Sequence, residues 1–156
     1  MESSINQHQK NLATFIHAST FSKYFFPFGN FILPLILWTS NKTESAYIDH
    51  HGKQALNFQI SILLYSIFLG ILAIPVFFFT SWDFIGFSDI FDHNTHHFDI
   101  DFRNGFNFRG GLAYIGIAGI LGLGLFILDI YCTISGAIKA REGILYRYPL
   151  TINFIK

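Results

Sequence analysis

Residues 55–79 read ALNFQISILLYSIFLGILAIPVFFF and contain no Lys, Arg, Asp or Glu. A second uncharged stretch, LAYIGIAGILGLGLFIL, occupies residues 112–128 and continues as a mainly apolar segment to residue 138. A helix needs about 20 mainly apolar residues to cross a bilayer. Both segments therefore predict membrane crossings, at about 55–79 and 112–138. Because two crossings return the chain to its starting side, the residues before the first and after the second should face the same compartment.

The composition agrees with a membrane protein and excludes several functions. Of the 156 residues, 51% are hydrophobic and only 13% are charged, whereas a soluble domain usually carries nearly twice that charge. The net charge is zero and there is no basic patch, so nucleic-acid binding has no support. The single cysteine, Cys132, excludes an intramolecular disulfide. An acidic residue, Glu2, lies where a signal peptide needs bases, so we expect the first apolar segment to stay in the mature protein.

Residues 12–38 form a third apolar segment that is interrupted. Its first half contains His17 and Lys23, and Pro27, Gly29 and Pro34 break or bend the rest. A kinked crossing is the favoured interpretation, and a re-entrant hairpin of two half-helices is the alternative. The sequence thus predicts an all-α polytopic membrane protein with three transmembrane helices, the first kinked or re-entrant, in a single membrane domain over residues 1–156.

The positive-inside rule gives an orientation. Basic residues lie before the crossing at 55–79 and after the crossing at 112–138, which is the same side of the membrane: Lys42, Lys53, Lys139, Arg141, Arg147 and Lys156. The rule predicts that this side is the cytoplasm. Residues 139–156 are then a cytoplasmic tail, and residues 80–111, with more acids than bases, form an extracytoplasmic loop. The side on which the N-terminus lies depends on whether the first segment spans or re-enters.

Two polar motifs lie at the ends of these crossings, at residues 49–59 and 138–149. Buried amides and charges in lipid need partners, so we expect the two motifs to meet in one network on the cytoplasmic face. Either this network fixes the helix register, or it binds a ligand or partner. Its candidate members are Asp49, His51, Lys53, Asn57, Gln59, Arg141, Arg147 and Tyr148.

Asp129 is the one acid within a predicted crossing. Ionisable residues in a membrane are functional candidates by default. It is either a proton or cation site of a transporter, or it is bonded to Ser61, Ser66 or the broken first segment.

The outer loop carries weak candidates for a metal site, namely His93, His96, His97 and Asp99. Imidazole and carboxylate groups suit zinc, but the spacing matches no closed zinc signature, and a solvated loop is the favoured interpretation. We predict neither a metal nor another cofactor. Enzymatic motifs such as Gly-x-Ser-x-Gly, a Walker loop or His-Glu-x-x-His do not occur, so the sequence favours a protein that is not an enzyme.

Several segments resemble a family of small prokaryotic membrane proteins of unknown function. They are residues 27–30 (PFGN), 34–38 (PLILW), 49–59, 139–143 (KAREG) and 146–150 (YRYPL). That family is similar to the channel-forming subunit of the chloroplast inner-envelope translocon, the Tic machinery. The resemblance covers about residues 12–79 and 112–156, and it implies a multi-pass protein of the bacterial cytoplasmic (inner) membrane.

The sequence therefore predicts a noncatalytic membrane subunit or scaffold that docks a partner through its cytoplasmic face. A channel or carrier that uses the broken first segment and Asp129 is the alternative, and a metal-sensing outer loop is a weaker one. Its expected partners are the lipid bilayer and either another membrane protein or a second copy of the chain.

Overall fold

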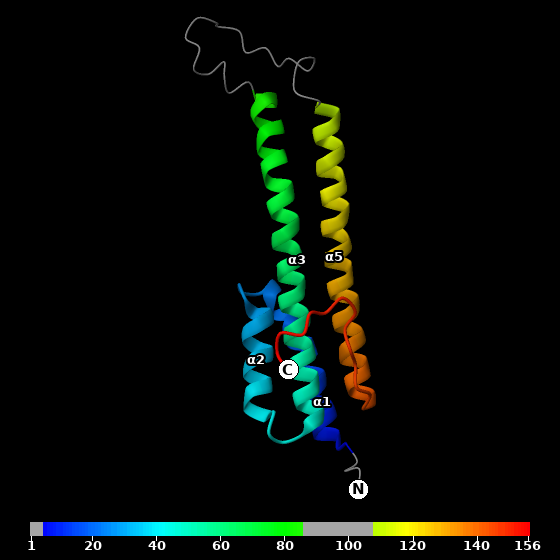
Figure 1. The fold of residues 1–156 in the computed structure, drawn as a ribbon. Coiled ribbons are helices and arrows are strands. Elements are labelled where there is room, and N and C mark those ends of the chain that lie inside the picture. The colour runs from blue at the N-terminus through cyan, green and yellow to red at the C-terminus, as the bar shows by residue number, and fades with distance from the viewer. Residues whose placement is uncertain (1–4, 86–107) are drawn as a thin grey trace, which may run out of the picture. The chain divides into compact units, whose positions relative to one another are not determined.

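The computed structural model describes the backbone of residues 5–85 and 108–156 and the side chains of residues 5–78 and 113–156. Regular structure within these residues is helical: α1 (Gln7–Ala18), the 3-10 helix η1 (Ser19–Tyr24), α2 (Gly29–Asn41), α3 (Ala46–Ile85) and α5 (Phe108–Glu142). Figure 1 shows these helices as ribbons. By its internal contacts the chain forms two compact units: unit 1 comprises residues 1–64 and 126–156, and unit 2 comprises residues 65–125. The predicted all-α class is confirmed.

Local hydrogen bonds define the ends of α1. The side chain of Asn6 accepts a hydrogen bond from the backbone N–H of Gln9, and the Gln9 side chain accepts one from the Asn6 backbone. This capping box satisfies donors that a helix start leaves without partners. At the other end, the hydroxyls of Ser19 and Thr20 donate to the carbonyls of Ile16 and His17, and the chain tightens into η1.

The direction of α1 and η1 follows from their contacts with α5. Thr14 lies against Ala137, with 3.4 Å between its hydroxyl and the carbonyl oxygen, while Lys23 further along pairs with Asp129. As residue numbers rise from 14 to 23, those of the contacted residues in α5 fall. This part of the chain is therefore antiparallel to α5.

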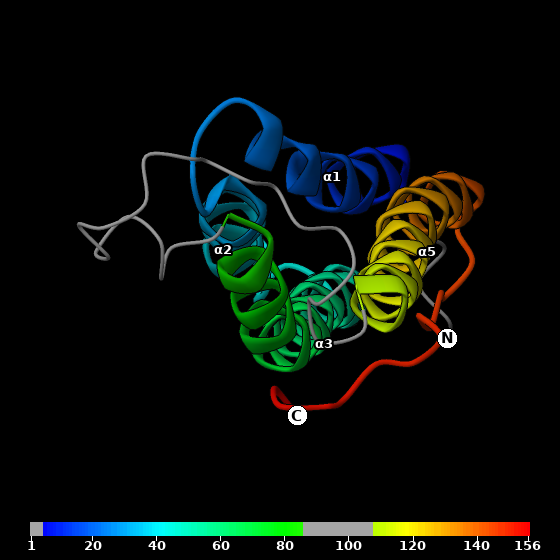
Figure 2. The same ribbon diagram turned by 90° about the horizontal axis from the view of Figure 1, so that it is seen from above.

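The direction of α2 follows in the same way from α3. Asn30 donates to Gln59 at 2.8 Å, and the Trp38 indole donates to Asp49 at 3.0 Å, so α2 is antiparallel to α3. Since α3 and α5 are themselves antiparallel in unit 1, α1 and α2 run in opposite directions. Figure 2 shows α1 lying between α2 and α5, across from α3. Residues 12–38 thus fold back as a helical hairpin.

The turn of this hairpin lies at residues 25–28 and has clear steric causes. Phe28 adopts a left-handed backbone conformation, with φ of 60°, and the preceding Pro27 disfavours continued helix. A Cβ atom at Gly29 would lie 2.6 Å from the backbone of Ser22, so only glycine allows this close approach. Pro34, by contrast, is accommodated inside α2 and is buried.

Two of the described helices are long and apolar enough to cross a membrane, over Ala46–Phe78 and Ala113–Glu142. They coincide with two of the three predicted crossings. The third crossing is not confirmed, because α2 has 13 residues, or about 20 Å of helix, and the chain reverses before it. The reversal of the chain is the geometry that the re-entrant alternative requires, and the entry of the hairpin into the membrane stays a prediction.

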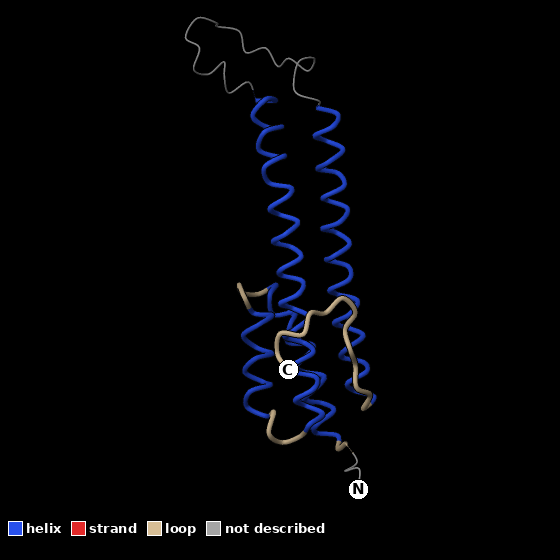
Figure 3. The backbone as a smooth tube through the Cα atoms, in the orientation of Figure 1, coloured by secondary structure: helices blue, strands red, loops and turns tan. Residues whose placement is uncertain are grey.

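The chain leaves α5 through a turn at Gly143, whose φ is +84°. The backbone N–H of Gly143 donates to Ala140 and that of Ile144 donates to Lys139, which is the Schellman pattern that ends many helices. Residues 143–156, here called the tail, then run back beside α3 and α5 as a non-helical segment (Figure 3).

In unit 2, small residues bring the two long helices together. The hydroxyl of Tyr114 donates to the carbonyl of Leu72 at 3.0 Å, and a Cβ at Gly122 would lie 3.7 Å from Leu69. An apolar groove of about 430 Å³ includes Ser66 and Gly70 from α3. Small side chains allow the close backbone approach on which helix packing in lipid depends.

Candidate functional site

At the start of α3, Asp49 holds two partners. It forms an ion pair with Lys53 at 2.6 Å, one turn further along the helix, and it accepts the hydrogen bond from the Trp38 indole. The indole lies so close to Gly52 that a Cβ there would overlap the ring. Asp49 and Gly52 together fix the end of α2 against α3.

One turn deeper, two histidines and a tyrosine form a buried chain of contacts. His17 Nε2 lies 2.8 Å from His51 Nδ1, and His17 Nδ1 lies 2.7 Å from the Tyr148 hydroxyl. Both histidines are 0% exposed. His51 Nε2 is buried and has no hydrogen-bond partner among the described residues. These side-chain contacts connect α1, α3 and the tail through residues far apart in the sequence.

Tyr148 is the anchor of the tail. Its ring stacks on Phe58 with 4.2 Å between the ring centroids, and its hydroxyl approaches Gly136, where a Cβ would lie 2.8 Å away. Burial raises the pKa of Tyr148 well above its ordinary value of 10, with smaller contributions from Tyr146 and Cys132. Burial likewise raises the pKa of Tyr146 to about 12. Both phenols therefore keep their protons at neutral pH and can donate hydrogen bonds.

Near the turn of the hairpin, Asp129 lies in a second buried cluster. Its carboxylate pairs with Lys23 of η1 and accepts a hydrogen bond from the Gln59 side chain at 2.9 Å. Gln59 in turn accepts one from Asn30 of α2. The side chains of Asp129 and Lys23 are 4% and 22% exposed. The carboxylate is therefore bonded within the protein, and part of its bonding comes from the broken first segment.

The amide of Asn57 fixes the end of the tail to α3. Its oxygen accepts the backbone N–H groups of Phe154 and Ile155, at 3.1 and 2.8 Å, and its nitrogen donates to the Ile155 carbonyl at 3.0 Å. Ser61 accepts the N–H of Ile152 at 2.9 Å. Side chains of α3 thus replace the hydrogen bonds that the non-helical tail cannot make with itself.

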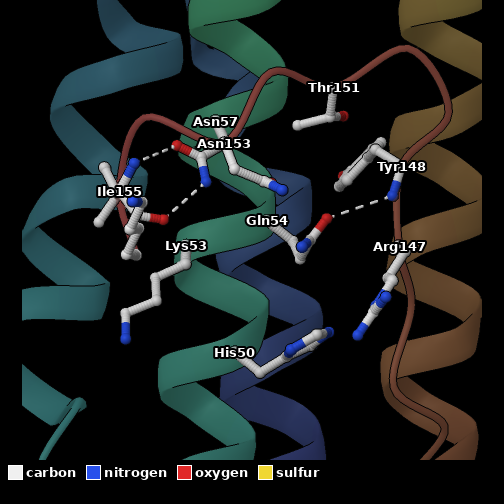
Figure 4. A pocket seen from close by; sticks show the side chains of 10 residues that line it. His50, Lys53, Gln54, Asn57, Arg147, Tyr148, Thr151, Asn153 and Ile155 are labelled. Carbon is white, nitrogen blue, oxygen red and sulfur yellow. Dashed lines mark hydrogen bonds between the residues drawn. The ribbon is translucent and has the colours of Figure 1, made fainter.

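A cavity of about 350 Å³ lies between α3 and the tail. Figure 4 shows Lys53 and His50 on the α3 side of the cavity and Arg147 on its tail side, with the uncharged side chain of Gln54 between them. We call it the basic cavity and define it by His50, Lys53, Gln54, Arg147, Thr151 and Lys156. Its lining contains three Lys or Arg residues and no Asp or Glu.

The residues predicted to form one network take part in several hydrogen-bonded groups, although four of them, Lys53, Asn57, Arg147 and Tyr148, line the same cavity. Asp49 pairs with Lys53, His51 reaches Tyr148 through His17, Gln59 binds Asp129, and Asn57 binds the tail. Arg147 lines the basic cavity, whereas Arg141 is exposed on the last turn of α5 and lines none of the described cavities.

The candidate metal ligands His93, His96, His97 and Asp99 lie outside the described residues. Within the described ranges, no group of three or more His, Cys, Asp or Glu residues is placed to hold a metal ion. The metal-sensing alternative stays a prediction about the loop.

Several members of the site were not assigned to it from the sequence: His50, Gln54, Thr151 and Lys156 of the basic cavity, and His17, Lys23 and Asn30 of the buried clusters. His17, Lys23 and Asn30 lie in the interrupted first segment, over residues 12–38. The sequence did contain a signal for such residues, because a buried acid at Asp129 and buried amides in α3 require polar partners from elsewhere in the chain. The pairing itself joins residues 29 to 131 positions apart.

The fold and the site define a class: a helical membrane protein in which a helical hairpin with buried polar side chains and a non-helical tail pack on the ends of two long apolar helices. Residues 8–155 match the model of the MamF/MmsF family, described as the magnetosome magnetite crystal formation protein family, and the chain belongs to that family. It is a small prokaryotic family, as predicted. No curated protein and no solved structure matches the chain. The similarity to the chloroplast translocon stays a prediction.

Proposed function

We propose that this protein is a noncatalytic membrane subunit that acts in magnetite crystal formation by docking a partner. The family description supports the process. The docking face is the one built from residues 49–59 and 139–150, which the fold brings together in unit 1. The partner is another membrane protein or a second copy of the chain.

The observation that carries this proposal is an open cavity of unit 1 at the edge of that face, which contributes His50 and Leu145 to the lining. It has a volume of about 550 Å³. The start of α1 contributes Gln9, the connection before α3 contributes Glu44, and the tail contributes Leu145. Leu145 is 59% exposed. A mixed polar and apolar hollow formed where three segments converge suits a protein side chain from a partner.

The arrangement of the polar side chains supports a role without catalysis. The carboxylate of Asp129 forms an ion pair and accepts a hydrogen bond within the protein, and so does that of Asp49. His17 contacts both of its neighbours. Groups that bind one another inside the protein hold its shape and are not presented to a substrate.

The side of the membrane is also part of the proposal. The bases that follow the positive-inside rule lie before α3, in its first turns and from the end of α5 onward. We therefore assign the docking face to the cytoplasm and the chain to a multi-pass position in the membrane. The magnetosome membrane is the one that the family description favours.

Co-purification in mild detergent tests the proposal. We expect a stoichiometric partner with the full-length wild-type protein and its loss from Leu145→Asn. Ile144→Asn is the matched control, because Ile144 is 48% exposed and does not line the cavity. Light scattering of the purified protein detects a second copy as the partner. Purification of the wild-type protein as a monomer alone, or equal retention by both variants, contradicts docking at this cavity.

A channel or carrier is the second candidate. The observation that favours it is the interrupted first segment, which folds as a hairpin with the Lys23–Asp129 pair near its turn, since broken helices in transporters often line solute sites. Ion flux through liposomes that contain only this protein supports a channel. The absence of flux from correctly folded protein removes this candidate and leaves the docking proposal standing.

A further inference from the structure

The basic cavity has a charge that the protein does not balance. Lys53 is compensated by Asp49. Arg147 is exposed and forms no ion pair with any described residue. No Asp or Glu side chain lines the cavity to pair with Arg147. A cavity with an uncompensated guanidinium attracts an anion.

The donors around the cavity suit a tetrahedral oxyanion. The guanidinium of Arg147 has a planar set of N–H groups that can bind two oxygens of a phosphate at once. The hydroxyl of Thr151, the amide of Gln54 and the ammonium of Lys53 line the same space. Figure 4 shows these groups on both walls, from α3 and from the tail. The volume of about 350 Å³ lies in the range of ligand pockets.

The position of the cavity suggests where the anion comes from. In α3, Lys53 is followed by an uncharged stretch that runs to residue 82, so the cavity lies where the charged end of the helix gives way to apolar residues. That boundary is the level of the lipid headgroups. The tail beside it exposes Ile152 and Phe154, at 42% and 48%. Such side chains are more stable against acyl chains than in water.

We propose that the basic cavity binds the phosphate group of an anionic phospholipid. The apolar side chains of the tail then lie against its acyl chains. The bound lipid bridges α3 and the tail, which are otherwise joined by a few hydrogen bonds such as those of Gln54 and Asn57. The site adjoins the docking cavity and shares His50 with it, but Arg147, Lys53 and Thr151 line the basic cavity and not the docking cavity.

Native mass spectrometry of the full-length protein in detergent tests the proposal with three probes: phosphatidylglycerol, phosphatidylcholine and inorganic phosphate. We expect the wild-type protein to prefer phosphatidylglycerol. Arg147→Gln should weaken that binding by about fivefold or more, the contribution of one basic residue to binding an anionic lipid surface. Arg147→Lys should lose less, because it keeps the charge.

Arg141→Gln is the matched control, because Arg141 is also exposed and belongs to the same end of the chain but does not line the basic cavity. It should bind phosphatidylglycerol like the wild-type protein. Circular dichroism confirms that each variant is folded. Equal binding by folded Arg147→Gln and wild-type protein overturns the proposal. Competition by millimolar inorganic phosphate, without a preference between the two lipids, assigns the cavity to free phosphate and overturns the lipid assignment.

Discussion

Gly52 shows how a single residue sets the distance between two helices. The Trp38 indole occupies the space that a Cβ at this position would take, and it is held there by the hydrogen bond to Asp49. Trp38 also belongs to the apolar cluster with Ile16 and Ile48. A larger residue at position 52 must therefore displace a ring that three other residues hold.

Gly52→Ala should destabilise the protein by about 1–3 kcal/mol, the usual effect of overpacking. Thermal unfolding in detergent, followed by circular dichroism, measures the change. Gly116→Ala is the control, because no atom lies within 4 Å of a Cβ placed there. Alanine is also the better helix former by up to about 1 kcal/mol, so this variant should be unchanged or slightly more stable. An equal loss in both variants contradicts the assigned role of Gly52.

His17 is the central member of the buried chain. His17→Ala leaves His51 Nδ1 and the Tyr148 hydroxyl without the partners that the structure shows, and each buried unsatisfied group costs about 1–3 kcal/mol. We expect a clear fall in the unfolding temperature and faster proteolysis of the tail. His8→Ala is the control, since the His8 side chain is 68% exposed. An unchanged unfolding temperature in His17→Ala would falsify the structural role of the buried contacts among His51, His17 and Tyr148.

At the scale of the elements, the hairpin of α1, η1 and α2 is held near its turn by the pair of Lys23 and Asp129. Removing one member of a buried pair leaves an uncompensated charge and costs about 3–5 kcal/mol, whereas replacing both members by neutral groups costs much less. Lys23→Met and Asp129→Asn should each be strongly destabilising. The double variant should be more stable than the sum of the two changes predicts.

A double-mutant cycle of unfolding free energies measures this coupling. Additive effects of the two substitutions would show that the pair does not hold the hairpin. Flux measurements on folded Asp129→Asn distinguish the alternatives for this carboxylate. Lost flux with unchanged stability indicates transport, and lost stability indicates a structural pair.

The sequence predicted the two long helices because their signal is local. A lack of charge over residues 55–79 and 112–128 is visible in the chain itself, and α3 and α5 contain both segments. The direction of the first segment is different, because it depends on pairings such as Lys23 with Asp129 across more than one hundred residues. The hairpin was therefore one of two interpretations, and no periodicity could choose between them.

The tail could not be predicted for a similar reason. Nothing in residues 143–156 shows a helical or strand period, and the segment takes its hydrogen bonds from Asn57, Ser61 and Gln54 of α3. The amides of α3 were recognised as needing partners. That their partners are backbone groups of the tail, and that Tyr148 reaches His17, follows only from the folded chain.

At the scale of the whole molecule, the hairpin determines on which side of the membrane the first helix begins. In unit 1, His8 of α1 lies 3.6 Å from Glu44, just before α3, and the side chain of Lys10 reaches Gly143 after α5. The starts of α1 and α3 and the end of α5 are therefore together. If the apolar parts of α3 and α5 cross the membrane, these three points share one aqueous compartment.

Labelling of engineered cysteines in intact cells checks this arrangement. In a Cys132→Ala background, we expect Gln7→Cys, Thr43→Cys and Glu142→Cys to have the same accessibility to a membrane-impermeant reagent. Asn94→Cys, in the loop that the sequence assigns to the opposite side, should have the reverse accessibility. A kinked first crossing would place residue 7 with residue 94 instead. Separation of residues 43 and 142 would remove the shared face itself, because a partner could not contact both ends of the two crossings.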